Sequence, residues 1–134
     1  MSWQAAWAQI GITFCFLFSA SAQPDLVGSY QGKWEGMTAS GDFELTLQQQ
    51  DGSWKAKVTF SIGETAVATT VSELKVDGGD LEITYVFELG GVKLQSRLKG
   101  SFRNGEFSGK YRTQTLAEGS LVDEGSCTAK RTTA

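Results

Sequence analysis

Hydrophobic and polar side chains alternate along most of the chain after residue 28. In the clearest run, from Trp54 to Ile62, an apolar residue occupies every second position. A second run extends from Leu81 to Leu89 and departs from the rule only at Val86. Because successive side chains of a strand point to opposite faces, this period predicts strands with one apolar and one polar face. No segment of helical length after residue 22 repeats every 3.6 residues, so an all-β fold is expected.

Glycine-containing turns separate the alternating runs. They lie at Asp51-Gly52, Gly63-Glu64, Asp77-Gly78-Gly79-Asp80, Gly90-Gly91 and Asn104-Gly105. Such sequences favour tight hairpins, because glycine and asparagine adopt the positive φ angles that these turns require. The runs and turns together predict strands near residues 29–38, 42–50, 53–62, 66–76, 80–89, 92–103, 106–114 and 125–131.

Consecutive strands joined by short hairpins form an up-and-down meander. An open meander of this length leaves two unpaired edges and an uncovered apolar face, and closure into a barrel removes both. We therefore predict an eight-stranded antiparallel up-and-down β-barrel. A two-sheet sandwich is the alternative, although sandwiches usually need longer crossover connections.

The N-terminal segment has the character of an export signal. An uncharged apolar stretch from Ile10 to Phe18 precedes Ser19-Ala20-Ser21-Ala22. A short apolar run followed by an A-x-A pattern indicates a secretory signal peptide spanning residues 1–22. No lysine or arginine precedes the run, so an uncleaved anchor or a misjudged start codon stays open. The expected mature chain, residues 23–134, is one domain without an integral membrane span, exported to the periplasm or the extracellular space.

Charge and residue types narrow the function. The chain has 12 basic and 15 acidic residues, whose signs alternate along the sequence without forming blocks. This distribution predicts no basic patch for anionic lipid and no nucleic-acid partner.

The chain lacks histidine, and no motif gathers serine, lysine and carboxylates. We therefore expect no catalytic residues, no metal and no cofactor. Glu35 and the Asp123-Glu124 pair are interpreted as solvated surface, and Asp77–Asp80 as a turn rather than a calcium loop.

One cysteine, Cys127, remains in the predicted mature chain. It alternates with Ser126 and Thr128, which places it on the apolar face of the last strand. A thiol buried among apolar side chains has a raised pKa and is unreactive. Pairing with a cysteine of another chain is the alternative.

The meander also distinguishes the two ends of the barrel. One end receives the tight turns at 51–52, 77–80 and 104–105, together with inward aromatic residues such as Phe102 and Phe107, and should be sealed. The other end receives the loops at 39–41, 63–65, 90–91 and 115–124 and should be the mouth. The inward residues near the mouth are expected to contact a ligand: Thr38, Phe43, Phe60, Phe87, Leu94 and Thr113. Residues 115–121 are interpreted as a lid over this mouth or as an ordinary loop.

Two classes of function are compatible with this pattern. In the first, the barrel binds a small apolar or amphipathic molecule and catalyses nothing. In the second, side chains fill the barrel, and an apolar flank near Val86 and Val67–Thr70 serves as an interaction or inhibitor surface. A cavity of several hundred Å³ favours the first class, whereas a filled barrel favours the second. The sequence leaves oligomerisation open.

A short motif resembles a known group of barrels. Gly32-Lys33-Trp34 resembles the G-x-W signature that opens lipocalin and avidin barrels, and the spacing to Phe43 is similar to that of avidins. The resemblance implies a basic residue of the last strand, at Lys130-Arg131, packed against Trp34 at the base of the barrel.

The biotin-binding residues of avidins are not matched. Where avidins carry an asparagine near the ligand, this chain has Gly36 and Thr38, and where they carry tyrosine and serine it has Phe60 and Ile62. The resemblance therefore implies a lipocalin-like apolar ligand rather than biotin.

Overall fold

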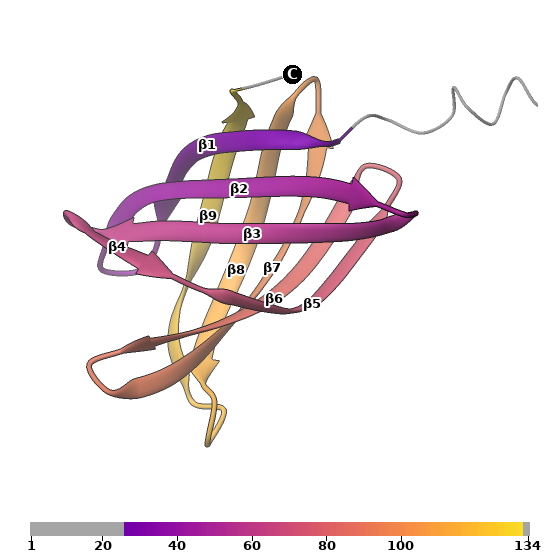
Figure 1. Cartoon of the computed structure of the whole chain (residues 1–134). Helices are drawn as coiled ribbons and strands as arrows, with labels where there is room; N and C mark the ends of the chain where they lie inside the picture. Colours follow the sequence, from indigo (N-terminus) through magenta and orange to yellow (C-terminus); the bar gives the residue numbers. More distant parts are fainter. Residues whose placement is uncertain (1–25, 133–134) are drawn as a thin grey trace, which may run out of the picture.

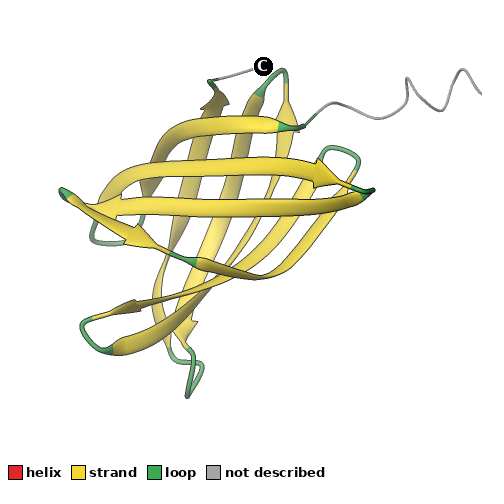
Figure 2. Ribbon diagram, in the orientation of Figure 1, coloured by secondary structure: helices red, strands yellow, loops and turns green. Residues whose placement is uncertain are grey.

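A computed structural model describes residues 26–132, which form a single antiparallel sheet curled into a nearly closed barrel (Figure 1). The strands are β1 (Gly28–Glu35), β2 (Ser40–Gln50), β3 (Ser53–Ile62), β4 (Thr65–Ala68), β5 (Thr70–Asp77), β6 (Asp80–Leu89), β7 (Val92–Arg103), β8 (Glu106–Thr115) and β9 (Leu121–Arg131). Figure 2 shows that strands and short loops make up this part of the chain. No helix within it is long and apolar enough to span a bilayer. The expected signal peptide lies outside the described residues.

The barrel closes by a route that the sequence did not predict. The sheet order runs β4-β3-β2-β1-β9-β8-β7-β6-β5, so its two edge strands are consecutive in the chain. β4 pairs with β3, β5 pairs with β6, and Thr69 lies between them. The Thr69 hydroxyl donates a hydrogen bond to the Val58 carbonyl at 2.7 Å. The single strand expected at 66–76 is therefore two strands, and the barrel has nine strands rather than eight.

Other strand boundaries move by a few residues. β1 ends at Glu35 rather than near Thr38, because the Gly36 N–H bonds the Ala39 carbonyl at 2.8 Å and closes a turn. β9 begins at Leu121 rather than near residue 125, so the last loop is shorter than expected. The remaining hairpins fall at the predicted turns.

Large side chains fill the sealed end of the barrel, to which the turns at 51–52, 78–79 and 104–105 belong. Tyr30 is fully buried there, and its hydroxyl donates to the Leu26 carbonyl at 2.8 Å. The Arg131 guanidinium donates to the same hydroxyl at 2.9 Å and lies 5.4 Å from the ring centroid. The Phe102 ring packs 5.0 Å from Tyr30. The late basic residue therefore packs on Tyr30 and not on Trp34, because β1 and β9 pair Tyr30 with Arg131.

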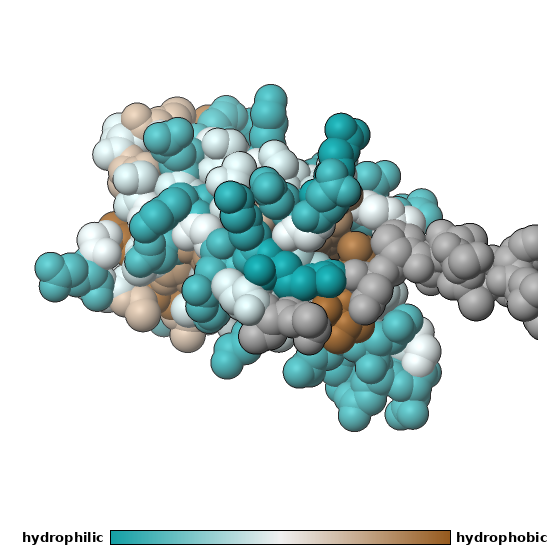
Figure 3. Space-filling view, turned by 90° about the horizontal axis from the view of Figure 1, so that it is seen from above, coloured by the Kyte–Doolittle hydropathy of each residue, from teal (hydrophilic) through white to brown (hydrophobic). Residues whose placement is uncertain are grey.

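The outer surface follows the predicted polar positions. Seen from above, the molecule is mostly hydrophilic, with apolar side chains in small groups (Figure 3). Val67, expected on an apolar flank, is instead buried inside the barrel, while Val86 is half-buried on the outer side. The expectation that no basic patch forms is wrong, because pairing of β7 with β8 places Arg97 opposite Arg112 and Lys99 opposite Lys110.

Gly32 marks the closest approach of β1 to its neighbour β9. A Cβ atom at this position would lie 1.8 Å from the Thr128 carbonyl oxygen and 2.6 Å from the Ala129 Cα. Both are backbone atoms, so a side chain is accommodated only by separating the two strands. The first residue of the Gly32-Lys33-Trp34 motif is thus required by packing, whatever the function.

We therefore expect Gly32→Ala to lower the free energy of unfolding by about 1–3 kcal/mol or more, the usual cost of overpacking a close contact. Gly79→Ala is the matched control, since its Cβ would meet only the Phe102 carbonyl oxygen at 3.4 Å. We expect this control to change the free energy by less than about 0.5 kcal/mol. Denaturant titration followed by circular dichroism measures both, and equal stability of the two variants would contradict the close approach.

Candidate functional site

The loop end of the barrel contains a cavity of about 200 Å³. Most of its wall is apolar or aromatic. Sixteen residues line it: Trp34, Thr38, Ala39, Phe43, Phe60, Ile62, Tyr85, Phe87, Leu89, Leu94, Ser96, Tyr111, Thr113, Val122, Asp123 and Cys127. The interior is therefore partly filled, with a core at the sealed end and a hollow at the mouth.

All six residues predicted to contact a ligand lie on the wall of this one cavity: Thr38, Phe43, Phe60, Phe87, Leu94 and Thr113. Alternation along the strands brings them there, because each of the five on strands points inward. Thr38 lies in the loop between β1 and β2 and is exposed at the rim. That these residues bind a ligand stays a prediction.

Aromatic rings form one side of the cavity. The Trp34 ring lies 6.0 Å from Phe60, which in turn lies 5.0 Å from Phe87, both in edge-on arrangements. Such contacts fix ring orientation beyond simple burial. The Trp34 indole N–H donates to the Ser61 carbonyl at 2.8 Å. Trp34 is buried as expected, but it lies at the mouth rather than at the base of the barrel.

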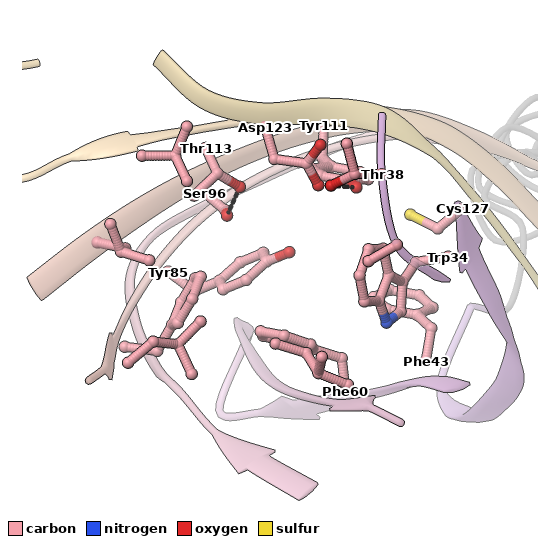
Figure 4. Close-up of a pocket in the computed structure, with 16 residues that line it drawn as sticks. Trp34, Thr38, Phe43, Phe60, Tyr85, Ser96, Tyr111, Thr113, Asp123 and Cys127 are labelled. Atoms are coloured by element: carbon pink, nitrogen blue, oxygen red, sulfur yellow. Dashed lines mark hydrogen bonds between the residues drawn. The ribbon is translucent and has the colours of Figure 1, made fainter. Parts of the chain in front are cut away.

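Polar groups gather on the opposite side, as Figure 4 shows. The Ser96 and Thr113 hydroxyls are hydrogen-bonded to each other across the β7–β8 pair. The Tyr111 hydroxyl donates to one Asp123 carboxylate oxygen at 2.8 Å, and the Met37 backbone N–H donates to the other at 2.9 Å. The cavity therefore has a polar wall from β7, β8 and β9 facing an aromatic wall.

Asp123 corrects an expectation, since it belongs to β9 and lines the cavity instead of lying in a solvated loop. The signal that identifies it is its even spacing from Cys127, which places both on the inward face once the strand extends to Leu121. The strand was expected to begin near residue 125, which left Asp123 in the preceding loop. Tyr85, Ser96 and Tyr111 also line the cavity but were not among the six predicted residues.

The protonation states of the cavity follow from burial. Burial raises the pKa of Tyr85. Burial, and secondly the hydrogen bond to Asp123, raises the pKa of Tyr111. Burial also raises the pKa of the Cys127 thiol to about 12. These three groups stay protonated at neutral pH. Asp123 is then the one carboxylate on the wall, and no lysine or arginine lines it.

The loop between β8 and β9 does not cover the mouth. None of residues 115–121 lines the cavity. The loop is closed on itself, because the Thr115 N–H bonds the Ser120 carbonyl and the Gly119 N–H bonds the Thr115 carbonyl, both at 2.9 Å. It projects from the lower end of the barrel in Figure 1. Of the two interpretations of this segment, the ordinary loop describes the structure.

Among residues 26–132, no three His, Cys, Asp or Glu side chains lie close enough together to hold a metal ion.

Comparison of the chain with protein-family models, curated proteins and solved structures found no match. The geometry of the cavity therefore carries the functional argument alone.

The buried thiol gives a test of this end of the core. The Cys15→Ser variant leaves Cys127 as the one cysteine of the chain. In this variant we expect native Cys127 to resist a thiol reagent at pH 8, because the thiolate is the reactive form and burial keeps the thiol protonated. We expect it to react once denaturant unfolds the chain. Ellman's reagent measures both rates. Rapid labelling of the native protein would contradict the burial and favour an accessible, pairing-competent thiol.

The same group sets a pH dependence. Its pKa is raised by folding, so its stabilising contribution is complete below the unfolded value of about 9 and is lost as the pH rises toward 12. The unfolding free energy should therefore fall by up to about 1.4 kcal/mol per pH unit from this group above pH 9. Cys127→Ala should remove this part of the fall in unfolding free energy, which denaturant titrations at a series of pH values measure.

Proposed function

We propose that this protein binds a small apolar or amphipathic molecule in the cavity at the loop end of its barrel, without catalysing a reaction on it. The observation that carries the proposal is the cavity itself, which is closed below by the aromatic core and open at the mouth. Predominantly apolar hollows with a few convergent polar groups are the usual form of small-molecule sites. The proposal includes export of the protein and a lipocalin-like mode of binding.

The size of the cavity limits the ligand. Its 200 Å³ correspond to roughly seven molecules of liquid water, less than the ~300–1,000 Å³ of sites for drug-sized ligands. The enclosed part of the ligand is therefore about one or two rings, or a short acyl chain. A longer molecule would leave its remainder outside the mouth.

The polar wall limits the chemistry of the ligand. Hydroxyls of Ser96, Thr113 and Tyr85 offer hydrogen bonds, and Asp123 offers negative charge. A ligand carboxylate would be desolvated near Asp123 without a cation to pair with, which is unfavourable. We therefore propose a ligand whose polar group is neutral or positively charged.

Binding rather than catalysis is favoured by the states of the side chains. The thiol of Cys127 is held protonated, so it is a poor nucleophile. The Ser96 hydroxyl is bonded to another hydroxyl rather than to a base. Ser96 thus lacks the adjacent base that would activate it as a nucleophile.

A second candidate is the interaction module. It is favoured by exposed apolar side chains at the loop end, namely Met37, Val92, Leu116, Leu121 and Val122. These residues lie on loops and strand ends at the loop end, away from Val86 and Val67–Thr70, where the sequence predicts such a surface. Oligomerisation through them would be detected as a concentration-dependent mass.

The first test is binding of 2-naphthol, a small neutral fluorescent probe with one hydroxyl. We expect saturable binding to the wild type and roughly tenfold weaker binding to Phe87→Ala, which removes one ring from the aromatic wall. Phe102→Ala is the control, since Phe102 packs on Tyr30 at the sealed end. No binding to the wild type, or equal weakening in both variants, would contradict the proposal.

The second test separates ligand charge. We expect hexylamine to bind more tightly than hexanoate at pH 7, because only the ammonium group pairs with Asp123. Asp123→Asn should reduce this preference by about tenfold, in the range of a charge-assisted hydrogen bond. Glu124→Gln is the matched control, because Glu124 is exposed on the outer face of the same strand. Calorimetry measures each affinity, and an equal effect of the two variants would exclude a direct role for Asp123.

A further inference from the structure

Positive charge is concentrated on two neighbouring strands, although the chain as a whole is acidic. β7 and β8 carry six of the 12 basic residues, with Glu106 as their one acidic residue. The rest of the chain holds the other six basic residues and 14 of the 15 acidic ones. The protein therefore has one positively charged wall opposed by an acidic remainder.

The register of this strand pair places like charges side by side. Arg97 lies opposite Arg112, and Lys99 lies opposite Lys110, all four exposed on the outer face. We call these four residues the basic wall. Like charges directly opposite each other destabilise a sheet. Within the barrel this arrangement has a cost that internal contacts offset little, so it points to an external anion.

Internal carboxylates neutralise little of the basic wall. The Lys99 ammonium lies 3.9 Å from the Glu82 carboxylate, at the far limit of an ion pair. Among residues 26–132, no salt bridge joins Arg97, Lys110 or Arg112 to a carboxylate. Glu124 is paired in register with Arg112 but does not reach it as an ion pair. Three of the four cations are therefore available to a partner.

The chemistry around the basic wall selects among anionic partners. Its flanking outer positions carry the amides of Gln95 and Gln114, and no outer position of β7 or β8 is aromatic or apolar. Stacking on single-stranded nucleic acid needs aromatic side chains, and protein interfaces depend on buried aromatic anchors. An extended array of phosphate headgroups needs neither.

The mouth end of the same strand pair supplies a second feature. Leu116 is exposed there by 47%, and its N–H donates to the Lys93 carbonyl at 3.0 Å. Val92 is also exposed but pairs with Leu89, which lines the cavity, so it lies on the inner face of β7. The apolar side chain of Leu116 thus borders the positively charged face. A basic face bordered by exposed apolar residues is typical of proteins that lie on anionic membranes.

We propose that the outer face of β7 and β8 docks the barrel on an anionic lipid bilayer. The basic wall contacts headgroup phosphates, and Leu116 meets the boundary of the acyl region. The acidic remainder of the protein is repelled by the same surface, so the charge asymmetry also orients the molecule. This docking does not depend on whether the cavity holds a ligand.

The test is co-sedimentation of the full chain with vesicles of phosphatidylglycerol and phosphatidylcholine, compared with phosphatidylcholine alone. We expect preferential binding to the anionic vesicles that is lost in about 0.5 M salt, where charges are screened within a few Å. Arg97→Gln/Arg112→Gln should weaken this binding by about tenfold or more. The variant should also be at least as stable as the wild type, because it removes a like-charge pair.

Lys55→Gln/Lys57→Gln is the matched control. It removes the same charge from two exposed positions on β3 and should leave binding within about twofold of the wild type. All variants carry the same residues 1–25, so any membrane affinity of that segment cancels. Equal weakening by both double variants, or no preference of the wild type for anionic vesicles, would overturn the proposal. Binding to soluble dextran sulfate without binding to vesicles would also overturn it, in favour of a soluble polyanion.

Discussion

The two edge strands of the sheet, β4 and β5, follow each other directly in the chain and bend apart at Thr69. This connection brings the edges together and closes the barrel, and the rest of the structure depends on it. An open sheet of nine strands would expose unpaired N–H and C=O groups along both edges and one apolar face. Here β4, which pairs with β3, ends at Ala68, and β5, which pairs with β6, begins at Thr70. The backbone of Thr69 therefore connects the two edge strands, which are not hydrogen-bonded neighbours in the sheet. The Thr69 side chain, bonded to Val58, holds the bend. Closure separates an inside from an outside, and only then do alternating residues acquire a core and a cavity.

The hollow at the mouth follows from how the inward positions are filled. Toward the sealed end, Phe107 packs its ring over the paired Gly100 and Gly109, and Phe102 lies 5.0 Å from it. Toward the mouth, the corresponding positions of β7 and β8 are occupied by Ser96 and Thr113. Small hydroxyl side chains fill less space than aromatic rings. The same two strands therefore border a filled core at the sealed end and a cavity at the mouth.

The alternation of apolar and polar residues and the glycine turns predict most of this fold, but fewer features of the cavity. Alternation and glycine turns predicted most strands, the two ends, the burial of Cys127 and the six residues that meet at the cavity. Those properties depend on neighbours in sequence, through the period of a strand and the φ preferences of turns. The break at Thr69 was not predicted, although Ala66-Val67-Ala68 already interrupts the alternation there. The segment is divided because its first half pairs with β3 and its second half with β6, and the sequence pattern does not show this choice of neighbours.

Pairing between distant strands explains the remaining differences. Arg131 packs on Tyr30, and Arg97 meets Arg112, because of registers that connect residues far apart in the chain. The charges of β7 and β8 look dispersed when they are read in order, since polar and apolar residues separate them. Asp123 was missed for a different reason: the strand was expected to begin too late to give it an inward face.

The contact between Tyr30 and Arg131 joins the first and last strands at the sealed end. Tyr30 also bonds Leu26, so both ends of the described chain are held on the same side of the core, opposite the cavity. The described chain therefore begins and ends on the side of the barrel away from the mouth. Leu26 and Thr132 thus lie on the opposite side of the barrel from the mouth of the cavity, so a fusion partner or an immobilising tag joined directly to either of them would start away from that mouth.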